Sequence, residues 1–312
     1  MIPETLRHKF FNDLLPNGNS STQTTHLRGQ LSALVDMAYI DEEQRREIQE
    51  RFAGRLHPLI TEPGLEDFTP FSATLIEAPA TDLQGQDSLI QSLERYNSDV
   101  ISVWITSTFK TPKLAQHLRQ ATFAYDEKPA PSDNPYEPPK PPRRYLLRYY
   151  DPLVTPTLYG QAPQEWQQWL FAPIINWWFA LASTTGEEWH QLVGGRNTQE
   201  QAQALIAPQL ILSQELKDAL HYDGYPHVLL EALEKNAPQL FTDNCKGVRL
   251  AQIRALLEQA QTYGITDKDN QGDFVYLGLK YTVSRVIHHP NWQAALRSAV
   301  SGQRRLIQTI QF

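Results

Sequence analysis

Short apolar runs alternate with amphipathic stretches through the first half of the chain. Apolar runs of strand length occur at residues 31–36, 71–78 and 99–107. The last run is β-branched and nearly all apolar, which is typical of a strand buried on both faces. Amphipathic stretches at residues 41–54 and 86–97 separate the three runs and have the spacing of helices. This alternation predicts an α/β N-terminal lobe with a mostly parallel sheet.

Polar and turn-forming residues mark where the predicted helices begin and end. Asp41 is suited to cap the first helix, and Gly54 is suited to stop it. Thr111 followed by Pro112 predicts the start of another helix, because proline is favoured at the first helical position. The next strand is predicted at residues 145–151, with the sequence YLLRYYD. The repeat of strand and helix thus extends to the end of that segment.

The pattern changes to helices alone from Thr198 onward. Ser213 is placed to begin one helix, and residues 248–264 carry an apolar stripe at helical spacing. These features predict an all-α C-terminal lobe. The predicted parts are an α/β lobe, a connection and a helical lobe, at residues 1–182, 183–207 and 208–312.

Residues 126–142 are rich in proline and interrupt the α/β pattern. Proline lacks a backbone N–H and favours extended conformations, so this segment is unsuited to a helix or a central strand. We expect an exposed excursion between a helix and the next strand. The alternative is a scaffold protein in which residues 129–142 bind a proline-recognition domain.

Composition and charge favour a soluble protein that binds neither nucleic acid nor a membrane. Hydrophobic residues make up 41% of the chain and charged residues 20%, and the net charge is −7. A negative net charge disfavours attraction to nucleic acid or anionic lipid. The N-terminus has no signal-peptide pattern, and polar residues and proline interrupt the most apolar stretch, Trp166–Ala182. We therefore expect a cytoplasmic protein.

The sequence motifs predict no cofactor and no metal site. Cys245 is the only cysteine, which excludes an intrachain disulfide and a cysteine-based zinc site. His288 and His289 are adjacent, so on a helix they point in different directions. The HExxH motif and the glycine-rich phosphate loops do not occur. Gly194-Gly195-Arg196 is an isolated loop, which we interpret as a lobe boundary.

Ser107, His117 and Asp151 form the alternative hypothesis of an α/β hydrolase-like enzyme. Ser107 and Asp151 end predicted strands, where ligands bind in open α/β sheets. However, no GxSxG elbow surrounds Ser107, and His117 lies in the middle of a predicted helix. We therefore favour a protein that is not an enzyme.

Aromatic residues gather in the segment PQEWQQWLFAPIINWWFA, residues 163–180. Tryptophan offers a large contact area at a low entropic cost and dominates interface hot spots. One interpretation places these side chains in a core between the lobes, and the other places some of them on an exposed face that holds a partner. The candidate partner-binding residues are Trp166, Trp169, Phe171, Trp177 and Trp178.

The stretch RYYDP, residues 148–152, has the residues of a structural corner. On the predicted strand, Arg148 and Asp151 face opposite ways. We expect Arg148 to pair with a carboxylate at the sheet edge, and Asp151 to cap the turn that Pro152 fixes. A catalytic role would need a nearby base or metal, and the sequence indicates none.

Several short motifs follow one another in a characteristic order. The main motifs are Ala33-Leu34-Val35-Asp36, a strand ending at Ser107, His117-Leu118-Arg119, Arg148-Tyr149-Tyr150-Asp151-Pro152 and Phe171-Ala172-Pro173-Ile174. Together they resemble the adaptor, or effector-chaperone, family of bacterial type VI secretion, whose domain was long labelled only as one of unknown function. Tyr149 stands where this family usually has phenylalanine, and Met37 stands where glycine is common.

The resemblance implies a task in protein delivery. Such adaptors bind a cognate toxic effector in the cytoplasm and load it onto the spike protein VgrG or its PAAR cap, and they are not thought to be exported themselves. The resemblance implies a structural role for the motif residues His117 and Arg119 and for the segment 148–152. The expected partners are therefore a secreted effector and the spike.

Overall fold

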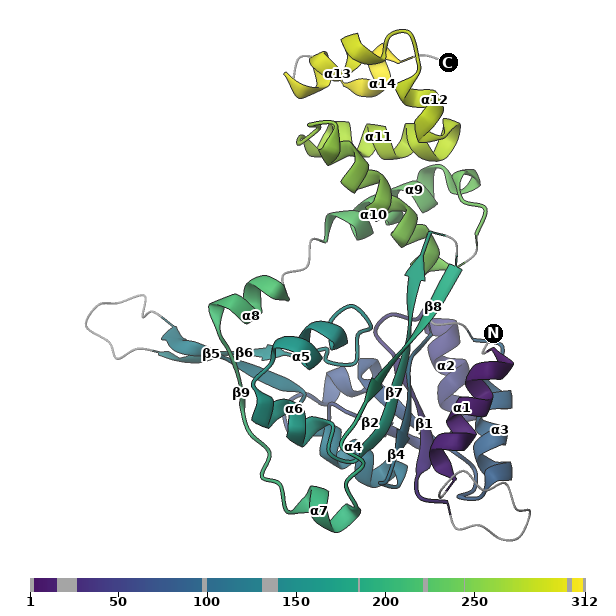
Figure 1. Ribbon diagram of the computed structural model, residues 1–312, viewed down its shortest axis with the longest axis vertical. Helices are drawn as coiled ribbons and strands as arrows, with labels where there is room; N and C mark the ends of the chain where they lie inside the picture. The colour runs from purple at the N-terminus through teal and green to yellow at the C-terminus, as the bar shows by residue number, and fades with distance from the viewer. Residues whose placement is uncertain are drawn as a thin grey trace. The chain divides into compact units, whose positions relative to one another are not determined.

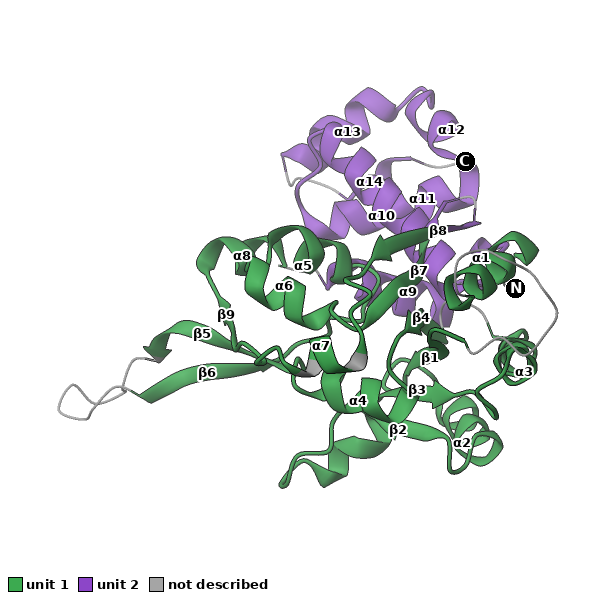
Figure 2. Ribbon diagram, turned by 60° about the horizontal axis from the view of Figure 1, so that its bottom comes forward, with its two compact units in different colours: residues 1–181, 189–221 green, residues 182–188, 222–312 purple. Residues whose placement is uncertain are grey.

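The computed structural model is shown in Figure 1. The residues that it describes are 3–15, 27–96, 100–130, 140–184, 186–220, 224–243, 245–301 and 305–310. The chain divides into two compact units (Figure 2). Unit 1 comprises Met1–Leu181 and Trp189–His221, and unit 2 comprises Ala182–Glu188 and Tyr222–Phe312.

The main sheet has six strands in the order β2-β3-β1-β4-β7-β8. Their bounds are β1 (Gln30–Asp36), β2 (Leu56–Pro58), β3 (Ala73–Glu77), β4 (Ile101–Ser107), β7 (Ile174–Ser183) and β8 (Gly186–Val193). The pairs β1–β3, β2–β3, β1–β4 and β4–β7 are all antiparallel. The prediction of a mostly parallel sheet is therefore wrong.

The strands are antiparallel because two strand–helix–strand units are interleaved. β1 and β2 both run antiparallel to β3, so they are parallel to each other with β3 between them. The helix α2 (Glu42–Arg51) connects them. β3 and β4 are likewise parallel with β1 between them, and α3 (Leu83–Leu93) connects them. The alternation in the sequence identified the two helical crossovers, but it does not encode the strand that each crossover skips.

Helices cover both faces of this sheet (Figure 1). α1 (Glu4–Leu14), α2 and α3 pack on one face, and α4 (Thr111–Arg119), α5 (Thr155–Gln161) and α6 (Gln164–Leu170) pack on the other. Along β1, Leu31, Ala33 and Val35 join the first core, and Leu34 joins the second. This alternation follows from the two-residue period of a strand. The sheet thus separates two apolar cores.

A smaller sheet contains the ends of the proline-rich segment. Its order is β6 (Lys140–Leu146), β5 (Phe123–Ala130) and β9 (Leu210–Leu212), with β5–β6 antiparallel and β5–β9 parallel. β6 is exposed along its length and is an edge strand, the position in a sheet where proline is tolerated. The strand predicted at residues 145–151 is wrong, because β6 ends at Leu146. Residues 131–139 of the predicted excursion lie outside the described residues.

The structural boundaries differ from the predicted ones. Residues predicted as a connection include β8 and the short helix α7 (Gln199–Gln203). β9 and α8 (Gln214–Ala219) belong to unit 1, because β9 pairs with β5. Unit 2 therefore combines Tyr222–Phe312 with Ala182–Glu188, whereas the predicted helical lobe starts at residue 208.

Unit 2 is helical from Tyr225 onward. Its helices are α9 (Tyr225–Asn236), the 3₁₀ turn η3 (Pro238–Leu240), α10 (Lys246–Thr262), α11 (Lys268–Tyr281), α12 (Val283–Ile287), α13 (Trp292–Val300) and α14 (Leu306–Thr309). Gly264 follows α10 with φ of 80°, a conformation that favours glycine, and ends the helix. Phe274 and Trp292 lie in one buried core, with ring centroids 6.1 Å apart.

Candidate functional site

Arg148 lies at the centre of an ion-paired corner beside the end of β1. Its Nη2 atom lies 2.7 Å from Oδ2 of Asp36 and 3.3 Å from Oδ2 of Asp151. Its Nη1 atom donates to the hydroxyl of Tyr39 at 3.0 Å. Asp36, which is 3% exposed, also accepts a hydrogen bond from the backbone N–H of Ala38 at 3.1 Å. Arg148 thus has a carboxylate partner, Asp36, at the end of the inner strand β1.

Burial and the attraction between opposite charges shift the pKa values of the groups in the corner. Burial raises the pKa of Asp36, and the guanidinium of Arg148 opposes that rise. Burial alone would lower the pKa of Arg148, but the carboxylates of Asp36 and Asp151 outweigh it and raise that pKa. Burial also raises the pKa of the Tyr150 phenol. A permanently charged guanidinium and a protonated phenol suit structural pairing rather than proton transfer.

The segment after β6 is a turn that leads into α5. The carboxylate of Asp151 accepts a hydrogen bond from the backbone N–H of Leu153 at 2.9 Å. The hydroxyl of Thr155, the first residue of α5, lies 2.7 Å from the backbone oxygen of Tyr149 and 2.9 Å from that of Asp151. Pro152 has no N–H to continue a sheet. The segment therefore turns where the sequence predicted a continuing strand.

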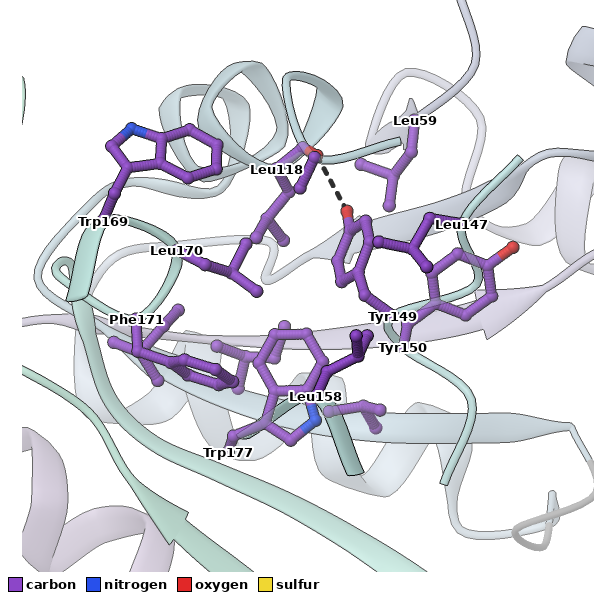
Figure 3. Close-up of a cluster of buried hydrophobic side chains, with 14 of the residues drawn as sticks. Leu59, Leu118, Leu147, Tyr149, Tyr150, Leu158, Trp169, Leu170, Phe171 and Trp177 are labelled. Atoms are coloured by element: carbon purple, nitrogen blue, oxygen red, sulfur yellow. Dashed lines mark hydrogen bonds between the residues drawn. The ribbon is translucent and has the colours of Figure 1, made fainter. Parts of the chain in front are cut away.

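The motif on α4 connects this helix to three other segments. Nε2 of His117 lies 3.0 Å from the backbone oxygen of Leu170 at the end of α6. The backbone oxygen of Leu118 accepts a hydrogen bond from the hydroxyl of Tyr149 at 2.9 Å, as Figure 3 shows. Nε of Arg119 donates to the backbone oxygen of β2 residue Pro58 at 2.9 Å. Burial lowers the pKa of His117, so the neutral ring donates through Nε2.

Residues 31–168 match the family model described as a domain of unknown function, DUF4123. The matched region includes both sides of the corner, Asp36 and Arg148, and the motif on α4. No curated protein and no solved structure matches the chain. The DUF4123 match ends within α6, so the rest of unit 1 and all of unit 2 lie beyond it.

Within the DUF4123 region, the proposed catalytic triad does not assemble. The hydroxyl of Ser107 donates to the backbone oxygen of Pro173 at 2.8 Å and accepts from the N–H of Phe109 at 3.0 Å. His117 and Asp151 have the separate partners given above. Among the described residues no hydrogen bond joins any two of the three side chains. Each of the three side chains instead contacts backbone groups that hold the fold.

The aromatic residues predicted to hold a partner are buried. Trp166, Trp169, Phe171 and Trp177 belong to the core that contains α4 and Tyr149. Figure 3 shows Trp169, Phe171 and Trp177 in this core. Trp178 points to the opposite face of the sheet, since it follows Trp177 along β7. None of the five is more than 5% exposed. The interpretation that places some of them on an exposed face is therefore wrong, and partner binding by these five residues stays a prediction.

Other aromatic residues are exposed near the corner, and the sequence did not single them out. Tyr39 is 50% exposed, and Phe71, at the end of the 3₁₀ helix η2 (Glu66–Phe71), is 46% exposed. The guanidinium of Arg148 lies 4.2 Å from the ring centroid of Tyr39, and that of Arg45 lies 4.5 Å from Phe71. Neither ring lies in a run of aromatic residues: Tyr39 stands next to Ala38 and Ile40, and Phe71 opens the apolar run 71–78, which the sequence analysis interprets as a strand.

A pocket of about 460 Å³ lies beside α5 and α6 in unit 1. Its lining residues are Tyr159, Gln167, Gln168, Phe171, Val193, Gly194, Gly195, Asn197 and Leu205. None of these carries a charge. The loop that we interpreted as a lobe boundary is thus one wall of a pocket. Sequence reasoning missed it because the lining comes from α5, α6 and the segment after β8, which are distant along the chain.

The described residues provide no evident metal centre. No group of three or more histidine, cysteine, aspartate or glutamate side chains is placed to hold a metal ion within them. Within the same residues, no helix is both long and apolar enough to cross a membrane.

Proposed function

We propose that this chain is a non-enzymatic cytoplasmic adaptor of bacterial type VI secretion. In this role it binds a cognate toxic effector and loads it onto the VgrG spike or its PAAR cap. The proposal combines the resemblance of the motifs with the DUF4123 match over residues 31–168.

One observation carries the proposal: two of the motifs that bear the resemblance meet in space. Asp36 ends the first motif, and Arg148 begins the Arg-Tyr-Tyr-Asp-Pro motif 112 residues later. They form an ion pair at 2.7 Å. Motifs that are short and weak individually thus belong to one three-dimensional corner, which supports their interpretation as a single family signature.

The contacts of Ser107, His117 and Asp151 weaken the rival enzyme hypothesis, because all three side chains are engaged in structural contacts.

The surface of unit 1 also suits protein binding. Exposed aromatic side chains such as Tyr39, and an uncharged pocket, are features that proteins use to hold partners.

The test is a reconstitution and a secretion assay. The purified chain is mixed with the effector and the spike encoded beside its gene, and complexes are separated by size-exclusion chromatography. We expect complexes with both partners. Deletion of the gene should abolish secretion of that effector, while an effector carried by another spike is still secreted.

Two outcomes would overturn the proposal. One is a chain that binds neither the effector nor the spike. The other is normal secretion of the cognate effector from the deletion strain. Complementation with the wild-type gene controls for effects of the deletion on neighbouring genes.

A further inference from the structure

We propose that the pocket beside α5 and α6 binds an uncharged, extended segment of a partner polypeptide through one apolar side chain. This inference rests on the proposed adaptor function, because it names the kind of partner segment that unit 1 holds. It follows from how the pocket is built, from its chemistry and from the exposed residues around it.

The glycine loop of the pocket is held against the turn before β7. The N–H groups of Gly194 and Gly195 donate to the backbone oxygens of Ile175 and Phe171, at 3.1 and 2.8 Å. A Cβ atom on Gly194 would lie 2.2 Å from the backbone oxygen of Ile174. Only glycine allows so close an approach, so this wall is formed before any ligand arrives.

The aromatic wall is anchored in the core as well. The ring of Tyr159 packs edge-on against Phe171, with centroids 5.0 Å apart, and its hydroxyl donates to the backbone oxygen of Val193 at 2.9 Å. Phe171 in turn packs against the buried Trp177. A pocket with rigid walls binds with little loss of conformational entropy.

The polar groups of the pocket match a peptide backbone. The side-chain amides of Gln168 and Asn197 make no hydrogen bond within the described part of the chain, whereas that of Gln167 donates to the backbone oxygen of Ala162. An amide offers both a donor and an acceptor, which are the two groups that a peptide bond presents. With no charged lining residue, the pocket favours a neutral occupant over an anion or a cation.

Apolar surface continues outside the pocket. Val193 and Leu205 line it and are 49% and 41% exposed, and the adjacent Ile206 is 91% exposed. Exposed aliphatic side chains that gather beside a pocket mark a binding surface. They extend the apolar contact beyond the cavity itself, which fits a polypeptide segment with an aliphatic or aromatic anchor better than a small polar ligand.

The test selects peptides from a random phage-displayed library on the full-length chain. We expect enrichment of uncharged peptides that contain an aliphatic or aromatic residue. Leu205→Glu should weaken the selected peptides at least about tenfold, because it places a carboxylate beside an apolar anchor. Gln168→Ala should weaken them by a smaller factor, about threefold to tenfold, because it removes a neutral hydrogen bond.

Val228→Glu is the matched control, since Val228 is 64% exposed and lies in unit 2. It adds the same charge and should leave peptide binding unchanged. Thermal unfolding by circular dichroism checks that each variant is folded, and Leu205→Ala provides a milder change at the same position. Enrichment of charged peptides, or equal binding by wild type and Leu205→Glu, would overturn the inference.

A second measurement separates this inference from the proposed function. The pull-down of the effector is repeated with Leu205→Glu and with Val228→Glu, and we expect a loss of at least about tenfold with the former alone. If Leu205→Glu binds the effector as well as wild type does, the pocket inference fails and the adaptor function stands. If wild type binds neither effector nor spike, the adaptor function fails, while the peptide selection still decides whether the pocket binds peptides.

Discussion

The ion pair between Arg148 and Asp36 joins segments that are far apart in the sequence, so its removal tests the corner directly. Arg148→Met keeps much of the side-chain length but leaves the buried carboxylate of Asp36 without its partner. We expect a loss of about 2–4 kcal/mol in the free energy of unfolding, measured with urea. The double variant with Asp36→Asn should recover part of this loss, because no uncompensated charge remains.

Arg144→Met is the matched control for this prediction. Arg144 pairs with Glu62 at an exposed site, where an ion pair contributes at most about 1 kcal/mol. Equal losses for Arg144→Met and Arg148→Met would contradict a structural role for the corner.

His117 makes the stability of unit 1 depend on pH. Burial lowers its pKa in the folded state, whereas the unfolded chain takes up the proton near the ordinary value of about 6.5. The unfolded state therefore binds more protons in acid, and stability should fall below about pH 6.5 by up to about 1.4 kcal/mol per pH unit. His117→Gln should flatten this slope in urea titrations between pH 7.5 and 5.5. His8→Gln, which changes an exposed side chain, should leave the slope as it is in wild type. An unchanged slope in His117→Gln would refute the assignment of this pH dependence to His117.

At the scale of the elements, the loop after β8 has a strict steric requirement at Gly194. Gly194→Ala places a methyl group 2.2 Å from the backbone oxygen of Ile174, so the loop has to move. We expect a loss of about 1–3 kcal/mol in the free energy of unfolding. Gly160→Ala, in α5 with nothing within 4 Å of the new atom, should be neutral or stabilising by up to about 1 kcal/mol. A fully stable Gly194→Ala variant would show that the loop is not packed as described.

Local patterns predicted individual elements well where one face of an element is polar or a cap is present. Asp41 caps α2 by accepting from the N–H of Gln44, as its position suggested. β7 was missed because residues 174–180 are buried on both sides, so no two-residue alternation is visible. The three-residue strand β9 is too short to produce a pattern. At the candidate site, the partner of Arg148 was expected as a residue type, but only the fold identifies it as Asp36.

For the molecule as a whole, strand direction was the property that the sequence did not reveal. In the sequence, an apolar run followed by a helix has the same pattern in two cases: the strand after the helix can pair directly with the first strand, or another strand can lie between them. β3 separates β1 from β2 through pairs such as Leu34–Leu75 and Leu75–His57, which are contacts between distant segments. Pairing between distant segments decides whether neighbouring strands are parallel. The local periodicity of the sequence does not predict this pairing.

The division into two units predicts two separable unfolding events. The core around Phe274 shares no residue with either core of unit 1. Phe274→Ala removes a fully buried ring and should destabilise unit 2 by about 3–5 kcal/mol. Hydrogen exchange should then show faster exchange in residues 224–301, while amides of β1 and β4 keep their protection. Leu75→Ala in β3 is the reciprocal variant and should accelerate exchange in unit 1. If both variants accelerate exchange equally throughout the chain, the two units unfold together, and the separate cores do not define separate cooperative units.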